Sequence, residues 1–253
     1  MELVGEQLDA RAAHRGTVSM SSAYKLEISV ESVDAAVAAE RGGADRIELC
    51  SNLKVGGTTP ERELLRAVRE RVRVPIFSMV RPRGGDFFFS EAEFAAMEQD
   101  IDAAKDAGMD GVVLGLLTND GRIDIAKTKQ LVELARPLPV TFHRAFDASS
   151  GDLRGALEDV IETGATRLLT SGGKRTAPEA LELLGELVRI AGKRLIVMPG
   201  SGLHAGNIRE AVVKTGAREF HAGLSSVASS VAGHIGAFEE EVRRMAGALR
   251  DCD

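Results

Sequence analysis

Two arginines in a short glycine-containing loop are the residues of this sequence whose chemistry is most readily inferred. The loop Arg81-Pro-Arg-Gly-Gly-Asp86 directly follows the apolar residues 74–80, which have the composition of a strand. A guanidinium can bind two oxygens of a carboxylate or phosphate at once, and glycines let backbone N–H groups approach a ligand. We therefore predict anion binding by Arg81, Arg83 and Asp86, with Arg81 at the surface of the site and contributing little to the core. The alternative is a surface turn with two solvated arginines.

Polar residues also follow other apolar runs. Arg144 and Asp147 come just after residues 139–143, and His221 lies near the end of residues 218–222. A carboxylate or an imidazole in a closed site can titrate near neutral pH, so Glu48 and His143 are candidate general acid or base residues. Arg144, Asp147 and His221 are predicted ligand contacts. A structural network of ion pairs would give the same pattern.

Glycine-rich loops follow two of the later apolar runs. One contains Ser171, Gly172 and Gly173, and the other contains Gly200 and Gly202 just before a helical pattern. Backbone N–H groups in such loops commonly hold a phosphate, so these five residues are predicted ligand contacts. Ordinary turn formation is the alternative, because glycine is common where strands meet helices.

These loops must be positioned by the elements around them, and the chain alternates eight short apolar runs with helical patterns. Glycines at 43, 108, 164 and 216 each precede an apolar run, as expected of helix C-caps. Residues 24–253 are therefore predicted to form one (β/α)₈ TIM barrel domain, with an open doubly wound sheet as the alternative. The expected strands are 25–30, 46–50, 74–80, 111–115, 139–143, 167–171, 194–198 and 218–222, and the expected helices include 33–41, 60–72, 90–107 and 178–191, starting after Ser32, Thr59, Ser90 and Ala177.

In such a barrel the carboxyl ends of the strands surround one mouth, where polar residues from several strands meet. Period-two alternation turns Glu27 and Glu48 toward the interior. A buried glutamate needs a partner, and we expect Arg81, Arg83 or Arg144 to provide it.

The composition excludes several classes of function. The net charge is −6 and aromatic residues make up 4% of the chain, so no basic, aromatic-rich surface for nucleic acid is expected. No apolar run is long enough to span a membrane, and the first twenty residues resemble no secretory signal. The two cysteines do not suggest a disulfide framework. We therefore expect a cytoplasmic protein.

Further predictions concern the two ends of the chain and the assembly. Residues 1–23 have little apolar periodicity and are expected to form a flexible extension, with Met20 as an alternative start of the protein. Residues 222–237 and a helix over 238–249 are expected to pack on the barrel or on a second subunit. A homodimer is the expected assembly.

Several long motifs resemble those of the copper homeostasis protein CutC family. They are Gly42-Gly-Ala-Asp-Arg-Ile-Glu-Leu-Cys50, Met79-Val-Arg-Pro-Arg-Gly-Gly-Asp-Phe87, Phe142-His-Arg-Ala-Phe-Asp147, Leu169-Thr-Ser-Gly-Gly173 and Glu219-Phe-His-Ala222. The resemblance runs from about residue 25 to residue 221. It implies a cytoplasmic TIM barrel associated with copper tolerance, with Cu(I) bound by cysteines at the ends of the first two strands.

This sequence departs from the family pattern at the first of those cysteines. Cys50 stands at the end of the second expected strand, but Ser29 occupies the position in the first. Cu(I) prefers sulfur ligands, so a site with two cysteines cannot form here. Cys50 is left as a candidate ligand, and the side chains that could assist it are Met79, Met198, His143 and His221.

Two hypotheses of different classes follow. In the first, the protein binds or handles Cu(I) near Cys50. In the second, it is an enzyme or a binding protein for a small anionic metabolite, such as a phosphorylated one, at the mouth of the barrel. A hydrolytic site in which His and carboxylates hold a metal is not indicated, because no His-x-His pair ends the first strand and no helix has metal-ligand spacing.

Overall fold

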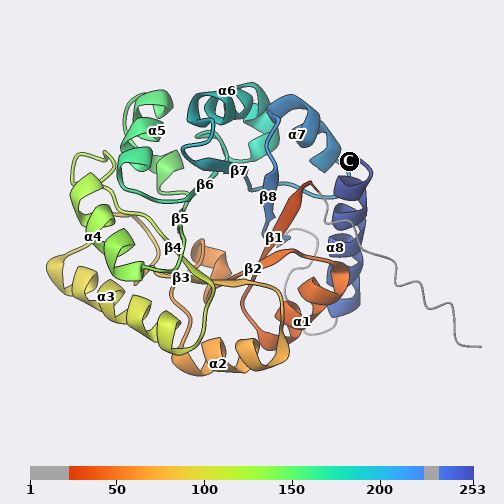
Figure 1. Cartoon of the computed structure of the whole chain (residues 1–253), viewed down its shortest axis with the longest axis horizontal. Helices are drawn as coiled ribbons and strands as arrows, with labels where there is room; N and C mark the ends of the chain where they lie inside the picture. Colours follow the sequence, from red (N-terminus) through yellow and green to blue (C-terminus); the bar gives the residue numbers. More distant parts are fainter. Residues whose placement is uncertain (1–22, 225–233) are drawn as a thin grey trace, which may run out of the picture.

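The computed structural model describes residues 23–224 and 234–253, and these form a ring of eight helices around a barrel of eight strands (Figure 1). The predicted extension over residues 1–23, with Met20, falls almost wholly outside the described residues. The strands are β1 (Lys25–Val30), β2 (Arg46–Leu49), β3 (Ile76–Met79), β4 (Gly111–Leu114), β5 (Val140–Phe142), β6 (Arg167–Thr170), β7 (Ile196–Pro199) and β8 (Glu219–Ala222). The helices are α1 (Val33–Gly42), α2 (Arg62–Arg71), α3 (Glu91–Asp106), α4 (Ile125–Ala135), α5 (Leu153–Glu162), α6 (Leu181–Ala191), α7 (Ile208–Thr215) and α8 (Ile235–Arg250).

All neighbouring strands pair in parallel, in the order β7-β6-β5-β4-β3-β2-β1-β8. A parallel bridge between Gly200, just after β7, and His221 of β8 closes the ring. The predicted single-domain TIM barrel is therefore confirmed, and the alternative of an open sheet is wrong. All carboxyl ends of the strands lie on one face of the barrel, as this topology requires.

Local capping explains where several helices begin. The Ser32 side chain accepts a hydrogen bond from the Ala35 N–H at the start of α1, and Ser90 forms a reciprocal capping box with Glu93 at the start of α3. The predicted start at Thr59 is wrong, because α2 begins at Arg62 and the Thr59 hydroxyl instead donates to Asp100.

The predicted start after Ala177 is also displaced. A short 3₁₀ turn covers Ala177–Ala180, and the regular helix α6 begins only at Leu181. Pro178 lies in this 3₁₀ turn, where its missing N–H group leaves no donor unsatisfied.

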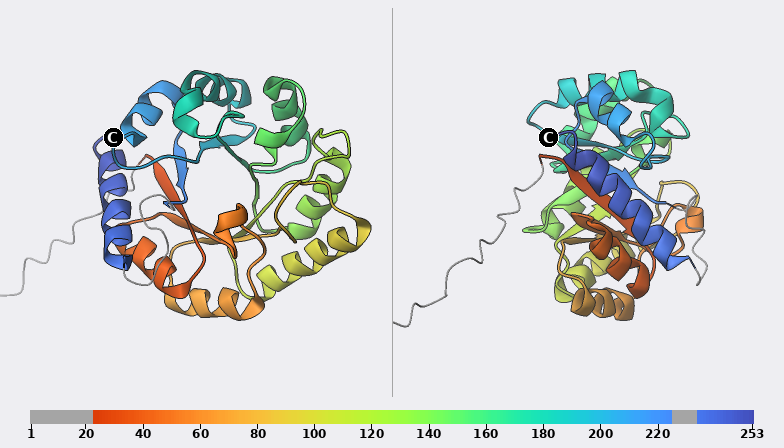
Figure 2. Two further views of the ribbon diagram at one scale, coloured as in Figure 1. Left: turned by 180° about the vertical axis from the view of Figure 1, so that it is seen from behind. Right: turned by 90° about the vertical axis from the view of Figure 1, so that its right-hand side faces the viewer.

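The last helix packs on the barrel. Helix α8 lies against α1, α7 and β1, and Figure 2 shows it running alongside β1 and α1. The contact is close, since a Cβ added to Gly42 of α1 would lie 2.6 Å from the Val242 Cβ of α8. The expectation of packing on the barrel is thus correct for the helix over 238–249, while most of residues 222–237 fall outside the described residues.

Charged side chains fill the amino-terminal half of the barrel interior. Arg46 pairs with Glu27 and, at 2.7 Å, with Glu219, and Arg167 pairs with Glu219 at 2.6 Å. All four side chains are buried. The expectation that a loop arginine would be the partner of Glu27 is wrong, because Arg46 of the adjacent strand β2 forms this ion pair instead.

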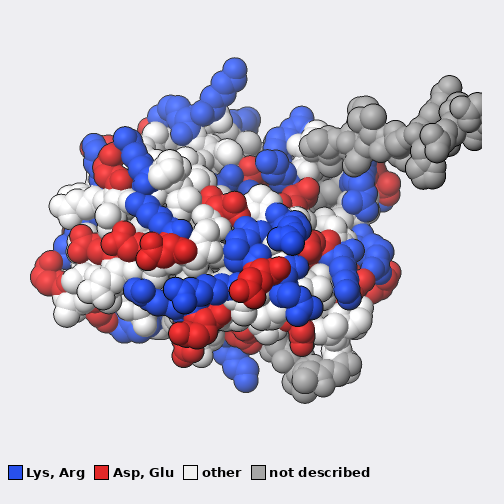
Figure 3. Space-filling view, turned by 60° about the horizontal axis from the view of Figure 1, so that its bottom comes forward, with Lys and Arg blue, Asp and Glu red and all other residues white. Residues whose placement is uncertain are grey.

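On the outer surface, acidic and basic side chains are interspersed over the face drawn in Figure 3. Oppositely charged surface side chains also pair, as Arg154 does with Glu186 at 2.7 Å and Arg194 with Glu158 at 2.6 Å. Among the described residues, no helix combines the length and the apolar character needed to cross a membrane.

Candidate functional site

A pocket of about 550 Å³ opens at the carboxyl ends of the strands. This volume is in the range of small-molecule sites. The residues that line it are Ser29, Glu48, Leu53, Val55, Gly56, Met79, Arg81, Gly85, Phe87, His143, Arg144, Asp147, Ala148, Leu169, Lys174, Ser201, Gly202, Leu203, His221, Gly223 and Leu224.

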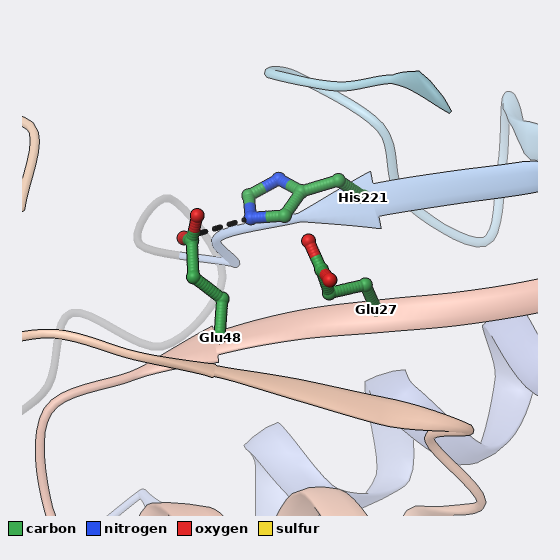
Figure 4. Close-up of side chains that lie close together, drawn as sticks. All are labelled: Glu27, Glu48 and His221. Carbon is green, nitrogen blue, oxygen red and sulfur yellow. Dashed lines mark hydrogen bonds and ion pairs between the residues drawn. The ribbon is translucent and has the colours of Figure 1, made fainter. Parts of the chain in front are cut away.

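A buried ion pair, Glu48 with His221, lies at the floor of the pocket (Figure 4). The His221 Nε2 is 3.1 Å from the Glu48 Oε2. Burial opposes the charge of each group, but the histidine lowers the pKa of Glu48 and the carboxylate raises the pKa of His221. Both shifts favour the charged pair. The expected arginine partner of Glu48 is therefore replaced by a histidine from β8.

Glu27 lies next to this pair, on β1. One oxygen from each glutamate and one ring nitrogen of His221 lie within 4.8 Å of one another, so the three residues could hold a metal ion. Sequence spacing did not indicate this group, because its members lie on three strands that are adjacent in space and distant in the chain. A His and carboxylate cluster is thus present despite the missing His-x-His pair.

His143 projects into the pocket from the end of β5 as a neutral imidazole. Its burial and the nearby Arg81 lower its pKa to about 3. The Nδ1 accepts a hydrogen bond of 3.2 Å from the Ala145 N–H, which places the ring proton on Nε2. This Nε2 is buried and has no partner among the described residues. His143 therefore has a hydrogen-bond donor without an acceptor, and its contact with a ligand stays a prediction.

Arg81 is buried, with 4% of its surface exposed, so the prediction that it lies at the surface is wrong. Its guanidinium donates to the backbone carbonyls of Val55 (3.1 Å), Gly57 (3.0 Å) and Gly85 (2.9 Å), and it stacks on Phe87. Within the described part of the chain its Nε has no acceptor. Arg81 therefore organises the pocket wall, and one of its N–H groups is buried without an acceptor.

The other charged residues of the same loop lie outside the pocket. Arg83 pairs with Asp86 at 3.0 Å and with Glu93 at 2.6 Å. Neither Arg83 nor Asp86 lines the pocket. Their proposed ligand contacts stay predictions, and Arg83 provides a natural control for the arginines that do line it.

The loop after β6 already holds an anion, the carboxylate of Asp147. The N–H groups of Ser171 and Gly173 donate to this carboxylate at 3.0 to 3.1 Å, and the Gly172 N–H donates to the Thr170 hydroxyl at 2.9 Å. Arg144 also pairs with Asp147, at 2.8 Å. A ligand at Ser171, Gly172 or Gly173 would have to displace Asp147, so those three contacts stay predictions.

The loop after β7 has free backbone donors. Ser201 and Gly202 have φ of +74° and +72°, a left-handed pair that turns successive N–H groups toward one side. The N–H groups of Gly202 and Leu203 donate to no acceptor within residues 23–224 and 234–253. Gly202 lines the pocket, whereas Gly200 packs under it against Leu169. The sequence analysis missed Ser201, Leu203 and Lys174.

Cys50 lies behind Glu48 and does not line the pocket. It is fully buried, and its thiol donates to the Glu48 carboxylate at 3.6 Å. Burial and the charge of Glu48 raise the pKa of the Cys50 thiol well above its ordinary value. Cys252 lies beyond α8 in the outer layer, where its thiol donates to the Ala248 carbonyl. Neither cysteine has the exposed, electropositive surroundings of a reactive thiolate.

Known proteins match most of the chain. The CutC family model matches residues 24–226. A CutC family protein of Chromobacterium violaceum is 50% identical over 197 residues, which cover 78% of this chain and 79% of that protein. The human copper homeostasis protein cutC homolog is 46% identical over 215 residues, or 85% of this chain and 78% of that protein.

Solved structures of known proteins have the same fold. A copper homeostasis protein CutC from Streptococcus agalactiae superposes with a TM-score of 0.74 at 31% identity, covering 79% of this chain and 98% of that one. Thiamine phosphate pyrophosphorylase from Pyrococcus furiosus has a TM-score of 0.61 at 17% identity, covering 91% of this chain and 97% of that one. The second similarity supports the fold alone.

Proposed function

The chain belongs to the CutC family, and from this premise we propose that the mouth of its barrel binds a small anionic metabolite. The chain is a homologue of copper homeostasis proteins. The proposal concerns the molecule that enters the pocket, for which the family name gives no chemical description.

One observation carries the proposal: hydrogen-bond donors without acceptors gather around one pocket. They are the Nε of Arg81, the Nε2 of His143 and the backbone N–H groups of Gly202 and Leu203. A buried donor that lacks an acceptor costs about 1–3 kcal/mol, which a ligand oxygen would recover. Oxygen-rich anions supply several acceptors at once, so they fit this set better than an apolar ligand does.

Charge at the rim favours the same ligand. Arg144 and Lys174 line the pocket on the side of the β5 and β6 loops, and buried Arg81 adds a third cation in the wall. The pocket also contains a carboxylate, Glu48, whose Oε1 is buried without a donor among the described residues. A ligand that carries both an anionic group and a hydroxyl or other donor would supply acceptors for the unpaired donors and a donor for Glu48.

This arrangement also bears on the candidate acid and base residues. The neutral state of His143 suits a fixed donor to a ligand oxygen, since an imidazole with a pKa of about 3 does not exchange protons near neutral pH. Glu48 is charged, but its lowered pKa makes the carboxylate a weak base. His143 is therefore proposed to orient the ligand, and Glu48 stays a candidate acid or base.

Direct Cu(I) binding by Cys50 stays a prediction with less support. Cu(I) binds thiolates, and the pKa of the Cys50 thiol is raised by burial and by Glu48. Ser29 stands on β1 at the position where the family pattern has a cysteine, and it lines the pocket. A link between this protein and copper does not require the metal to occupy Cys50.

A thermal-shift screen with inorganic phosphate, sugar phosphates, small carboxylates and chelator-buffered Cu(I) tests the proposal. An anion at about 100 times its Kd stabilises the fold by about 2.7 kcal/mol, which raises the Tm by roughly 5–10 °C for a chain of this size. Arg144→Ala should remove this shift. The matched control Arg83→Ala, outside the pocket, should keep it.

Two outcomes contradict the proposal: no anion of the panel raises the Tm, or Arg83→Ala and Arg144→Ala reduce the shift equally. Stabilisation by Cu(I) alone, lost in Cys50→Ser, would instead support the copper hypothesis.

A further inference from the structure

Glu27, Glu48 and His221 form a compact group of metal-binding side chains at the floor of the barrel mouth. They come from the adjacent strands β1, β2 and β8, and Glu27 is the direct register partner of His221. One donor atom from each residue lies within 4.8 Å of the other two, and all three are buried. Figure 4 shows the two carboxylates and the imidazole turned toward one another.

Each residue of the group has a polar atom with nothing to bind. The Oε1 of Glu27, the Oε1 of Glu48 and the Nδ1 of His221 are buried without a hydrogen-bond partner in the described structure. Their exposed fractions are 0%, 3% and 7%. Buried carboxylate oxygens are normally hydrogen-bonded or bound to a cation. Two such oxygens beside one imidazole therefore point to a missing cation.

The Oε2 atoms of the two glutamates accept hydrogen bonds from neighbouring side chains. Arg46 Nε donates to the Glu27 Oε2, and the Cys50 thiol donates to the Glu48 Oε2 at 3.6 Å. Carboxylate ligands of metals commonly have such supporting donors, which fix their orientation. The Glu48 Oε2 also contacts the His221 Nε2, and the Oε1 of each glutamate is left without a partner among the described residues.

The donor set identifies the class of metal. One imidazole and two carboxylates suit divalent first-row ions such as Zn²⁺ and Mn²⁺, whereas Cu(I) prefers sulfur. Glu48 and His221 line the pocket and Glu27 lies beneath them, so the open side of the group faces the pocket. Three protein ligands with an open side are typical of catalytic rather than structural sites.

We propose that Glu27, Glu48 and His221 bind one divalent first-row transition-metal ion whose free coordination positions face the pocket. The ion would take the place of the proton that His221 carries in its charged pair with Glu48. This goes beyond the proposed anion binding and does not depend on it, since the three ligands are all protein side chains. A bound ion would add positive charge at the floor of the pocket.

Calorimetric titration of the EDTA-treated full-length protein with Zn²⁺ tests the proposal. We expect one ion per chain in the wild type, and at least tenfold weaker binding in Glu48→Gln and His221→Gln, each of which removes a ligand. The matched controls are Glu70→Gln and His204→Gln, which change exposed residues that do not line the pocket. These two should bind Zn²⁺ like the wild type.

X-ray absorption of the Zn²⁺-loaded wild type gives a second test that needs no variant. We expect only nitrogen and oxygen neighbours, at about 2.0–2.2 Å. A sulfur neighbour at about 2.3 Å would indicate Cys50 and overturn the proposal. So would the absence of bound Zn²⁺, or equal affinity in Glu48→Gln, His221→Gln and the wild type.

The two proposals can fail separately. Zn²⁺ binding without stabilisation by any anion would support the metal site and contradict the anion pocket. Anion stabilisation that persists in Glu48→Gln, in a protein that binds no Zn²⁺, would support the pocket and contradict the metal site.

Discussion

The neutral state of buried His143 should make the protein lose stability in mild acid. Its pKa in the folded chain is about 3, whereas an unfolded histidine titrates near 6.5. Between these values the unfolded chain binds a proton that the folded chain does not. Stability therefore falls as the pH drops from about 6.5 toward 3, and the loss is absent above that window.

The size of the effect follows from this shift. Each pH unit within the window is worth about 1.4 kcal/mol, so His143 should cost about 2 kcal/mol between pH 7 and pH 5. Only 4% of the residue is exposed, so solvent screening reduces this figure little. His221 acts in the opposite sense, because Glu48 raises its pKa and the resulting stability is lost as the pH rises.

A comparison of wild type with His143→Gln isolates the contribution of His143. Glutamine keeps an acceptor for the Ala145 N–H and does not titrate. Urea unfolding followed by far-UV circular dichroism at pH 7, 6 and 5 measures the free energy of unfolding, and it suits a chain without tryptophan. From pH 7 to pH 5 the wild type should lose about 2 kcal/mol more than the variant.

His204→Gln, which changes an exposed histidine outside the pocket, is the control and should follow the wild type. Parallel curves for wild type and His143→Gln would show that His143 takes up its proton in the folded state. In that case the assignment of a fixed Nε2 donor in the pocket would be wrong.

Two further predictions concern packing and the pocket wall. Arg81→Ala should lower the free energy of unfolding by about 2–4 kcal/mol, because three loop carbonyls, of which that of Gly57 is buried, lose their donor. Arg83→Ala, at a half-buried residue outside the pocket, should have a smaller effect; urea unfolding at pH 7 measures both, and equal effects would contradict the assigned roles. Gly42→Ala should destabilise the protein by about 1–3 kcal/mol, because the added Cβ would meet Val242. Gly155→Ala, at an exposed position of α5 where an added Cβ would have nothing within 4 Å, should stabilise it by about 0.5–1 kcal/mol. A thermal melt that ranks the two variants the other way would refute the packing of α8 on α1.

The sequence predicted the barrel well because its signals are local. Each strand contains apolar residues within a short segment, and Ser32 and Ser90 cap helices through atoms three residues away. Thr59 looked like an equally good start, but its hydroxyl bonds to Asp100 on α3, which is far away in the chain. Whether a cap forms is thus decided by tertiary contacts that no local pattern contains.

The site was predicted less well because partners in a barrel are chosen across strands. His143 and His221 could be placed at the mouth from their positions after apolar runs. The pairing of Glu48 with His221 and of Glu27 with Arg46 depends on strand order and register. Arg81 was expected to reach outward, and the loop carbonyls that bind it inward have no sequence signature.

The four charged residues in the lower barrel constrain how this protein can change during evolution. Glu27, Arg46, Arg167 and Glu219 balance one another, two negative and two positive charges, on four different strands. Loss of one member would leave a buried charge unpaired, at a cost of about 3–5 kcal/mol, whereas joint replacement by apolar residues can be neutral. The four positions should therefore evolve together: a protein that descends from this one should either keep all four residues or replace all of them.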